Sequence, residues 1–348
     1  MSAGKQDIRK LSKAALREFF ISQGDKAFRA NQVFEWLWKK SVINFDEMTN
    51  LSKATREILT DHFTINGIEL KDSQQSADRT IKSTFRLHDN TIVEGVLIPT
   101  NNRMTACISS QVGCSLSCKF CATGKLKRER NLDAAEIYDQ VVQIKNQAEK
   151  TYTSPLTNIV YMGMGEPLLN YTNMLQSIEY ITSNEGLGMA SRRITVSTAG
   201  IAKMIRQLGD DAVKFNLALS LHAANDKKRS QMMEINNTNS LAELREALKY
   251  FFAKTKNPIT YEYILFDKFN DSLDDAEELF QYTRHLPSKV NIIEYNPVTD
   301  TPFAKAGPDR LDQFAAYLDK RGVTVKVRRS RGKDIDAACG QLAGKSKR

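Results

Sequence analysis

The chain has 348 residues, of which 41% are hydrophobic and 26% are charged. These proportions exclude a fibrous or disordered chain and leave room for one large domain with an extension, or for two domains. Fifty Lys and Arg against 41 Asp and Glu give a formal net charge of +9. This surplus favours an anionic partner, nucleic acid first, and the alternative is a basic surface without such a role.

The amino-terminal stretch, MSAGKQDIRKLSKAAL, is polar and lacks the apolar core of a secretion signal. No run of about 18 apolar residues occurs, so we expect a cytoplasmic protein without a membrane-spanning helix. Five cysteines, three of them close together, are an odd count that no secreted disulfide framework needs. In a reducing compartment such a cluster indicates metal or redox chemistry.

The first 60 residues show helical patterns. One helix is predicted in LSKAALREFFISQG, which ends at Gly24, and another in RANQVFEWLWKK, where Val33, Trp36 and Leu37 share a face. A third is predicted in SKATREILTDHF. The segments TIKSTFRL and TIVEGVLIP then flank the turn HDN and predict a β-hairpin. We therefore expect residues 1–98 to form a small helical module with a β-hairpin that links it to the rest.

From about residue 104 onward, strand and helix patterns alternate about six times. The first of these helices, LDAAEIYDQVVQIKNQAEK, is opened by Asp133, and Glu136 stands three residues later as in a capping box. This alternation predicts a parallel sheet with helices outside it, either open or closed into a barrel. Strand candidates are TACISS (105–110), NIVYMG (158–163), RITVST (193–198), KFNLALSLH (214–222), ITYEYILF (259–266), KVNIIEY (289–295) and VTVKVR (323–328). Further helices are predicted in NMLQSIEYIT, SLAELREALKYFFAK, SLDDAEELFQYTRHL and DRLDQFAAYLDKRG.

Chemically distinctive residues follow five of these strands. The segment CSLSCKFC follows the first strand and GMGEP the second, Ser197 ends the third, SLH ends the fourth, and NP at 296–297 ends the sixth. Active sites of such folds lie at the carboxyl ends of the strands. The sequence therefore predicts one site at this edge of the sheet.

Three cysteines in CSLSCKFC have the spacing C-x3-C-x2-C. Thiolates bind zinc or iron–sulfur clusters, and Cys107 or Cys339 could complete a four-thiolate zinc site. The spacing, with Phe120 before the last cysteine, resembles the radical S-adenosylmethionine (SAM) superfamily. That resemblance implies that Cys114, Cys118 and Cys121 hold a [4Fe–4S] cluster whose open iron binds SAM.

The segment YMGMGEPLLN resembles the GGEP-type motif of the same superfamily, which holds the methionine amino group of SAM. Gly165 and Glu166 are the matching positions. The alternative for a lone histidine at a strand end is a core residue whose hydrogen bonds are made within the protein. The resemblance further implies SAM contacts at strand ends. These contacts are Ser197, Ser220, Leu221, His222 and Asn296.

Together with SSQVGC, GMGEPLLN and FDEMTN, the segment DIDAACGQLAG resembles the RlmN/Cfr family of radical SAM methyltransferases over nearly the whole chain. Those enzymes modify an adenosine in the peptidyl-transferase centre of 23S rRNA, at C2 in the RlmN branch and at C8 in the Cfr branch. GEP rather than GEA favours C2, with an anticodon-loop adenosine of tRNA as a second substrate. The implied fold is α/β, a partial (β/α)6 TIM-like barrel over residues 99–348.

The same resemblance implies roles for the two remaining cysteines. One SAM methylates Cys339, and a second SAM yields a radical that activates this methyl group for addition to adenine. Glu94 removes a proton from the adduct, and Cys107 then attacks the sulfur of Cys339 and leaves a disulfide bond to be reduced. Adenine C2 needs this route because it is electron-poor and cannot attack the methyl group of SAM.

Basic residues cluster in GKLKRER (124–130), at Arg192 and Arg193, and in VKVRRSRGK (325–333). We expect these to bind RNA phosphates, with a solvated surface as the alternative. The resemblance also implies an electron donor such as flavodoxin or ferredoxin, and no feature indicates a dimer, so we expect a monomer. Two other functions stay open: a zinc-stabilised RNA-binding protein without catalysis, and a radical SAM enzyme for a small molecule or a protein.

Overall fold

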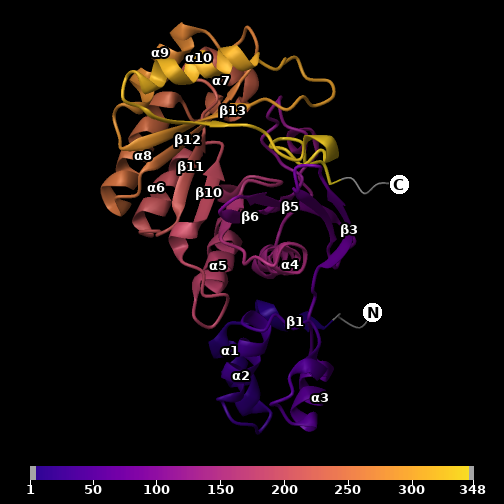
Figure 1. Cartoon of the computed structure of the whole chain (residues 1–348). Helices are drawn as coiled ribbons and strands as arrows, with labels where there is room; N and C mark the ends of the chain where they lie inside the picture. The colour runs from indigo at the N-terminus through magenta and orange to yellow at the C-terminus, as the bar shows by residue number, and fades with distance from the viewer. Residues whose placement is uncertain (1–4, 345–348) are drawn as a thin grey trace.

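The computed structural model describes residues 5–344, and its main element is one ten-stranded sheet (Figure 1). The strand order is β14-β13-β12-β11-β10-β9-β6-β5-β4-β3, and the seven strands from β14 to β6 are parallel. Because β14 and β3 are edges, the parallel part is a partial barrel, as predicted. The strands are β3 (Glu69–Gln75), β4 (Ile81–Arg86), β5 (Ile92–Thr100), β6 (Arg103–Cys107), β9 (Asn158–Tyr161), β10 (Ile194–Thr198), β11 (Asn216–Ser220), β12 (Ile259–Leu265), β13 (Ser288–Glu294) and β14 (Thr324–Arg328).

Helices connect the parallel strands and lie outside the curved sheet (Figure 1). They are α4 (Ala134–Tyr152), α5 (Tyr171–Thr182), α6 (Ala202–Asp210), α7 (Asp226–Met232), α8 (Leu241–Thr255), α9 (Leu273–Thr283) and α10 (Pro308–Asp319). The capping box of Asp133 and Glu136 forms as predicted. The sequence patterns missed α6 and α7, which are short, and α7 is too polar to show an apolar stripe. In residues 5–344, no helix is both long and apolar enough to cross a membrane.

The predicted β-hairpin lies within the main sheet. Its two strands, β4 and β5, are antiparallel, and β5 pairs in turn with β6. A further strand, β3, extends the sheet at this edge and was not predicted. Its sequence, ELKDSQQ, is polar because an edge strand exposes most of its side chains, so it carries no hydrophobic alternation.

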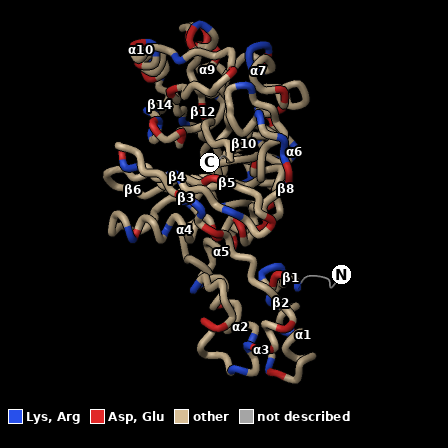
Figure 2. The backbone as a smooth tube through the Cα atoms, turned by 90° about the vertical axis from the view of Figure 1, so that its right-hand side faces the viewer, with Lys and Arg blue, Asp and Glu red and all other residues tan. Residues whose placement is uncertain are grey.

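The amino-terminal module contains α1 (Lys13–Ser22), α2 (Arg29–Trp38) and α3 (Lys53–His62), closed by the parallel pair β1 (Gln6–Asp7) and β2 (Phe63–Thr64). It lies at one end of the molecule, away from α9 and α10 (Figure 2). Val33 and Leu37 are buried as predicted, whereas Trp36 is only half-buried. Trp38 was not predicted to belong to the buried face, and its ring stacks on Tyr180 of α5 with ring centroids 3.6 Å apart.

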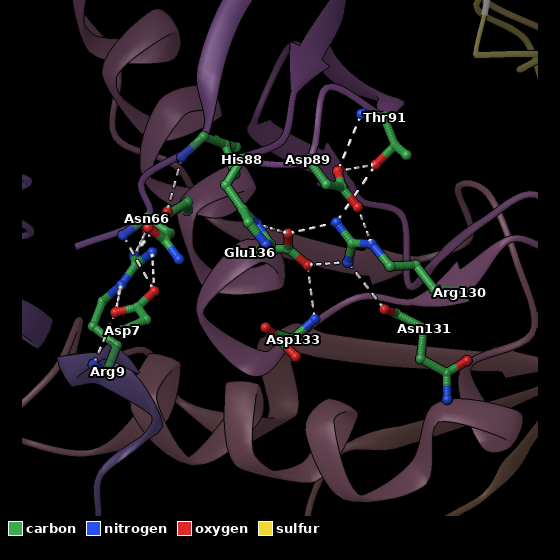
Figure 3. Close-up of polar contacts among 12 residues, drawn as sticks. Asp7, Arg9, Asn66, His88, Asp89, Thr91, Arg130, Asn131, Asp133 and Glu136 are labelled. Carbon is green, nitrogen blue, oxygen red and sulfur yellow. Dashed lines mark hydrogen bonds and ion pairs between the residues drawn. The ribbon is translucent and has the colours of Figure 1, made fainter. Parts of the chain in front are cut away.

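A buried ion network also joins this module to α4. Arg9 donates to both carboxylate oxygens of Asp139, at 2.9 and 2.8 Å, and lies beside Asp7 (Figure 3). The backbone N–H of Ile68 donates to the same Asp139 carboxylate at 3.3 Å. Arg9 is 5% exposed, so these charges compensate one another away from water.

We predict that Arg9→Met destabilises the protein by about 3 to 5 kcal/mol, because it leaves two buried carboxylates without their cation. The urea midpoint of the intact chain measures this loss. Lys53→Met is the matched control, since Lys53 pairs with Glu57 on the surface and its removal costs at most about 0.5 kcal/mol. Equal midpoints for the two variants would contradict a stabilising role for the network.

Candidate active site

An open cavity with about 900 Å³ of empty space lies at the carboxyl ends of the parallel strands. The residues that line it come from the three-cysteine loop, from the ends of β9 to β14 and from the carboxyl-terminal segment. They include Cys114, Cys118, Cys121, Thr123, Gly165, Glu166, Ser197, Ser220, His222, Glu262, Arg328 and Cys339.

The three-cysteine loop is held against the body of the protein by backbone and aromatic contacts. The N–H of Cys114 donates to the carbonyl of Leu126 at 3.3 Å, and that of Lys119 donates to Met232 at 3.0 Å. The ring of Phe120 meets the ring of His222 edge to face, with centroids 5.0 Å apart. These contacts direct all three cysteines to one cavity, as their spacing predicted.

These buried thiols are difficult to ionise unless a positive charge lies beside them. Burial raises the pKa of Cys114 to about 11 and that of Cys118 well above its usual value. The thiolate charges of Cys114 and Cys121 raise the pKa of Cys118 further. Within residues 5–344, no three ligand side chains gather closely enough to hold one metal ion. A [4Fe–4S] cluster binds each thiolate to a different iron, so this donor set fits a cluster.

The loop after β9 brings a backbone turn and a carboxylate to the same cavity. Gly165 has φ +94°, and a Cβ there would lie 2.5 Å from Cβ of Gln111. Glu166 is 3% exposed and accepts hydrogen bonds from the N–H groups of Ala199, at 2.7 Å, and Leu168, at 3.1 Å. Burial raises the pKa of Glu166 to about 7. An ammonium group in the cavity would favour its ionised form.

Five of the seven residues predicted to contact SAM line this cavity, and Leu221 and Asn296 do not. The hydroxyl groups of Ser197 and Ser220 lie 3.3 Å apart on neighbouring strands. Leu221 is fully buried in the hydrophobic core. Asn296 instead donates to the carbonyl of Cys339 at 3.5 Å, so it contacts the carboxyl-terminal segment.

His222 combines structural bonding with a position at the cavity. Its Nδ1 accepts a hydrogen bond from the N–H of Ile264 at 3.1 Å. Burial and the charge of Arg229 lower the pKa of His222 to about 3, so the ring is neutral at physiological pH. One ring nitrogen of His222 is therefore hydrogen-bonded as in a structural core histidine, and the side chain also lines the cavity.

Cys107 and Cys339 approach the site from different directions. Cys107 ends β6 and is buried, and its pKa is raised to about 12 by burial and by the nearby Cys339 thiol. Cys339 is exposed and lines the cavity. Both are free thiols in the described chain, so the disulfide bond expected between them is not formed here.

The segment that carries Cys339 rests on the three-cysteine loop. The N–H of Ala122 donates to the carbonyl of Gly340 at 2.7 Å, and the hydroxyl of Thr123 donates to that of Leu342 at 2.6 Å. Thr123 was not singled out in the sequence, because nothing local indicates a partner more than 200 residues away. These two bonds hold Cys339 beside the cysteines of the loop.

Glu94 lies beneath the same segment rather than in the wall of the cavity. Its carboxylate accepts hydrogen bonds from the N–H groups of Ala343, at 2.8 Å, and Gly344, at 3.1 Å. Figure 1 shows this carboxyl-terminal segment beside β5, the strand of Glu94. The Nζ of Lys82 lies 3.8 Å from the other carboxylate oxygen. Glu94 therefore anchors the segment of Cys339 as well as standing near it.

The ion pair of Glu262 and Arg328 in the cavity wall was not predicted from the sequence. The guanidinium of Arg328 lies 3.2 Å from the carboxylate of Glu262, and its charge lowers the pKa of Cys107 against the effect of burial. Glu262 is the single acidic residue in the fully buried strand ITYEYIL, which was a usable signal. Arg328 was hidden within the basic run expected to bind RNA.

Sequence comparison places these features in a known class. Residues 108–282 match the radical SAM superfamily, so the fold and the three-cysteine cavity define a radical SAM protein. Residues 6–65 match the ribosomal RNA large subunit methyltransferase N-terminal domain. A crystal structure of a radical SAM methyltransferase from Sphaerobacter thermophilus is 38% identical and has a TM-score of 0.92. The match covers 98% of this chain and 100% of that one.

Proteins named "Probable dual-specificity RNA methyltransferase RlmN" are similar over nearly the full length. The one from Cytophaga hutchinsonii is 59% identical, over 97% of this chain and 93% of its own. The one from Christiangramia forsetii is 55% identical, over 98% of this chain and 97% of its own. The chain belongs to the RlmN family of radical SAM methyltransferases.

We predict that the stability of the metal-free protein depends on pH through Glu166. Its folded pKa of about 7 exceeds the value of roughly 4.3 in an unfolded chain, so the folded state keeps the proton longer. This group therefore lowers stability as pH rises from about 4.5 to about 7. Between these limits Glu166→Gln gains up to about 3 kcal/mol relative to wild type.

Urea midpoints of both proteins across this pH range measure the change. Glu246→Gln is the matched control, because Glu246 lies on the surface and pairs with Lys249. A difference between Glu166→Gln and wild type that stays constant with pH would show that Glu166 keeps its ordinary pKa.

Proposed function

We propose that this protein is a dual-specificity RNA methyltransferase. It transfers a methyl group from SAM to C2 of an adenosine in the peptidyl-transferase centre of 23S rRNA, and of an anticodon-loop adenosine of tRNA. The names of its full-length relatives support the RNA substrates. One observation carries the chemistry: Cys339 lines the same cavity as the three loop cysteines and Glu166.

The proposed cofactor residues follow from the geometry of the cavity. Cys114, Cys118 and Cys121 would hold the [4Fe–4S] cluster, which with SAM supplies the radical that abstracts hydrogen. The backbone at Gly165 and the carboxylate of Glu166 would bind the amino group of SAM. Ser197, Ser220 and His222 would contact the rest of SAM from the strand ends. Leu221 would act through its backbone, and Asn296 would act by positioning the carboxyl-terminal segment.

The two remaining thiols are proposed to carry and release the methyl group. Cys339, exposed to the cavity, would take a methyl group from SAM, lose one hydrogen atom of that group to the SAM-derived radical, and bond to adenine through the remaining CH2. The adduct would then give one electron back to the cluster and one proton to Glu94. Cys107 would then attack the sulfur of Cys339: an S–S bond forms, the S–C bond to the base breaks, and the carbon keeps the electron pair and takes a proton to become the methyl group. An external thiol must then reduce the disulfide. The raised pKa of Cys107 means that it must lose a proton for this attack, and the adjacent charge of Arg328 favours the thiolate.

Glu94 is proposed as the base that removes the proton from adenine. Its carboxylate also accepts the N–H groups of Ala343 and Gly344, which follow Cys339 closely in the sequence. Proton transfer and the position of the Cys339 segment would therefore depend on one side chain. The two functions would be linked, because a carboxylate that takes a proton loses acceptor capacity toward the segment.

The proposed RNA surface is narrower than the basic runs suggested. Lys127 and Arg128, beside the loop, are exposed. By contrast, Arg130 pairs with Asp89 and with Glu136, which fixes the loop to α4 (Figure 3).

The other two basic runs also contribute less than expected. Arg192 and Arg193 precede β10, at the edge of the sheet opposite the cavity. In the third run, Arg329 pairs with Asp312 and Lys333 with Glu294.

The remaining proposals concern organisation and partners. Residues 1–98 would serve as the accessory RNA-contacting part and residues 99–348 as the catalytic core. The match of residues 6–65 to a methyltransferase amino-terminal domain supports the first of these. We further propose a monomer in the cytoplasm that receives electrons from a flavodoxin or a ferredoxin.

We predict that deletion of the gene removes methyl groups from C2 of one 23S rRNA adenosine and one tRNA adenosine. Mass spectrometry of nuclease digests, with 2-methyladenosine and 8-methyladenosine standards, identifies the carbon. A plasmid with the wild-type gene restores both, and one with Cys339→Ala restores neither. Loss of 8-methyladenosine instead would assign the protein to C8 methylation, and unchanged RNA would refute the proposed substrates.

We predict that purified Cys339→Ala loses all detectable RNA methylation but still cleaves SAM to 5′-deoxyadenosine, because the residues for the cofactors are untouched. Cys107→Ala is the matched partner. It forms the bond to RNA but cannot release it, so a covalent protein–RNA species accumulates on denaturing gels. Methylation by Cys339→Ala at the wild-type rate would exclude the carrier role, and Cys107→Ala without that species would exclude the resolving role.

A further inference from the structure

Arg229 of α7 is a fully buried cation whose direct partners are all neutral. Its Nε donates to the carbonyl of Leu221 at 3.1 Å, and its Nη1 donates to the side-chain oxygen of Asn236 at 2.8 Å. Its Nη2 donates to the carbonyl groups of Ala199 and Ser220. The side chain is 0% exposed, and a buried guanidinium normally has a carboxylate partner.

The charge of Arg229 is therefore poorly compensated by the protein. The linked carboxylate is that of Asp226, which shares Asn236 as a hydrogen-bond partner with Arg229, lies on the exposed start of α7 and offsets the effect of burial only in part. Burial lowers the pKa of Arg229 to about 10, so the group stays charged at neutral pH. Its unfavourable burial indicates that an anion absent from the polypeptide completes the site.

The three-cysteine loop is the adjacent source of such an anion. Lys119 of this loop donates its N–H to the carbonyl of Met232, at the end of the same helix as Arg229. Cys118 and Cys121 pack on an apolar cluster that contains Met232. Two of the three carbonyl groups that Arg229 binds belong to Ala199 and Ser220, which line the cavity.

We propose that Arg229 is the counter-charge of the [4Fe–4S] cluster and raises its reduction potential. This inference rests on the proposed function only in that a cluster occupies the three-cysteine loop. One-electron reduction adds a negative charge to a cluster that already carries three thiolates. A fixed cation in a medium of low dielectric constant stabilises the reduced form more than the oxidised form. Arg229 is a positioning residue here, since it acts through the field at the cluster.

A purely structural role makes a different prediction. In that case Arg229 only ties the ends of β10 and β11 to α7, and its replacement affects folding but not the electronics of the cluster. Two substitutions separate the roles. Arg229→Lys keeps the charge but loses the forked hydrogen bonds, and Arg229→Gln loses the charge.

The test is a redox titration of the anaerobically reconstituted full-length protein, followed by the electron paramagnetic resonance signal of the reduced cluster. We expect the midpoint potential of Arg229→Gln to shift to more negative values and that of Arg229→Lys to stay near wild type. Arg245→Gln, which removes a charge from the half-buried face of α8, should leave the potential unchanged. Equal potentials in wild type, Arg229→Lys and Arg229→Gln would overturn the inference.

A second variant serves if Arg229→Gln does not fold. Asn236→Asp leaves the guanidinium in place and sets a carboxylate on its Nη1, so the same negative shift is expected; an unchanged potential would again overturn the inference. The proposed function fails separately, when wild type itself binds no iron and sulfide after reconstitution.

Discussion

The parallel register of seven strands is the constraint on which the site depends. Strands that run in the same direction end at the same edge, so every loop after a strand opens into one cavity. The three-cysteine loop, the turn at Gly165 and the ends of β10 and β11 are brought to the same edge by this register, and local contacts then hold the loop in place. The carboxyl-terminal segment then covers them, because β14 is the last strand of the ladder and sends the chain back across the edge toward β5.

Residues whose meaning lies in local spacing could be predicted from the sequence. The C-x3-C-x2-C loop, the turn at Gly165 and the capping box at Asp133 each depend on neighbours a few positions away, and all three are in place. The alternation of strands and helices predicted the sheet for the same reason. The missed strand β3 is an edge strand with a polar sequence, so it lacks the burial pattern on which such predictions depend.

Residues whose meaning lies in a distant partner could not be predicted. In the folded chain the ring of Trp38 stacks on Tyr180, the hydroxyl of Thr123 donates to the carbonyl of Leu342, and Arg130 pairs with Glu136. Charge runs do not separate these cases, since a guanidinium bound to a carboxylate inside the fold and one exposed to solvent look identical in sequence. Glu262 could have been predicted to form a buried ion pair, because a single acidic residue in an otherwise apolar strand needs a buried partner.

In the proposed function, the junction between the amino-terminal module and α4 and α5 would determine how an RNA is recognised. It includes a stacked ring pair and a buried ion network. The separation between the module and the cavity is therefore a property of the fold. An RNA that touches both is selected by the distance between two points on its own folded surface. Two RNAs of unrelated sequence satisfy this requirement equally when their local shapes agree.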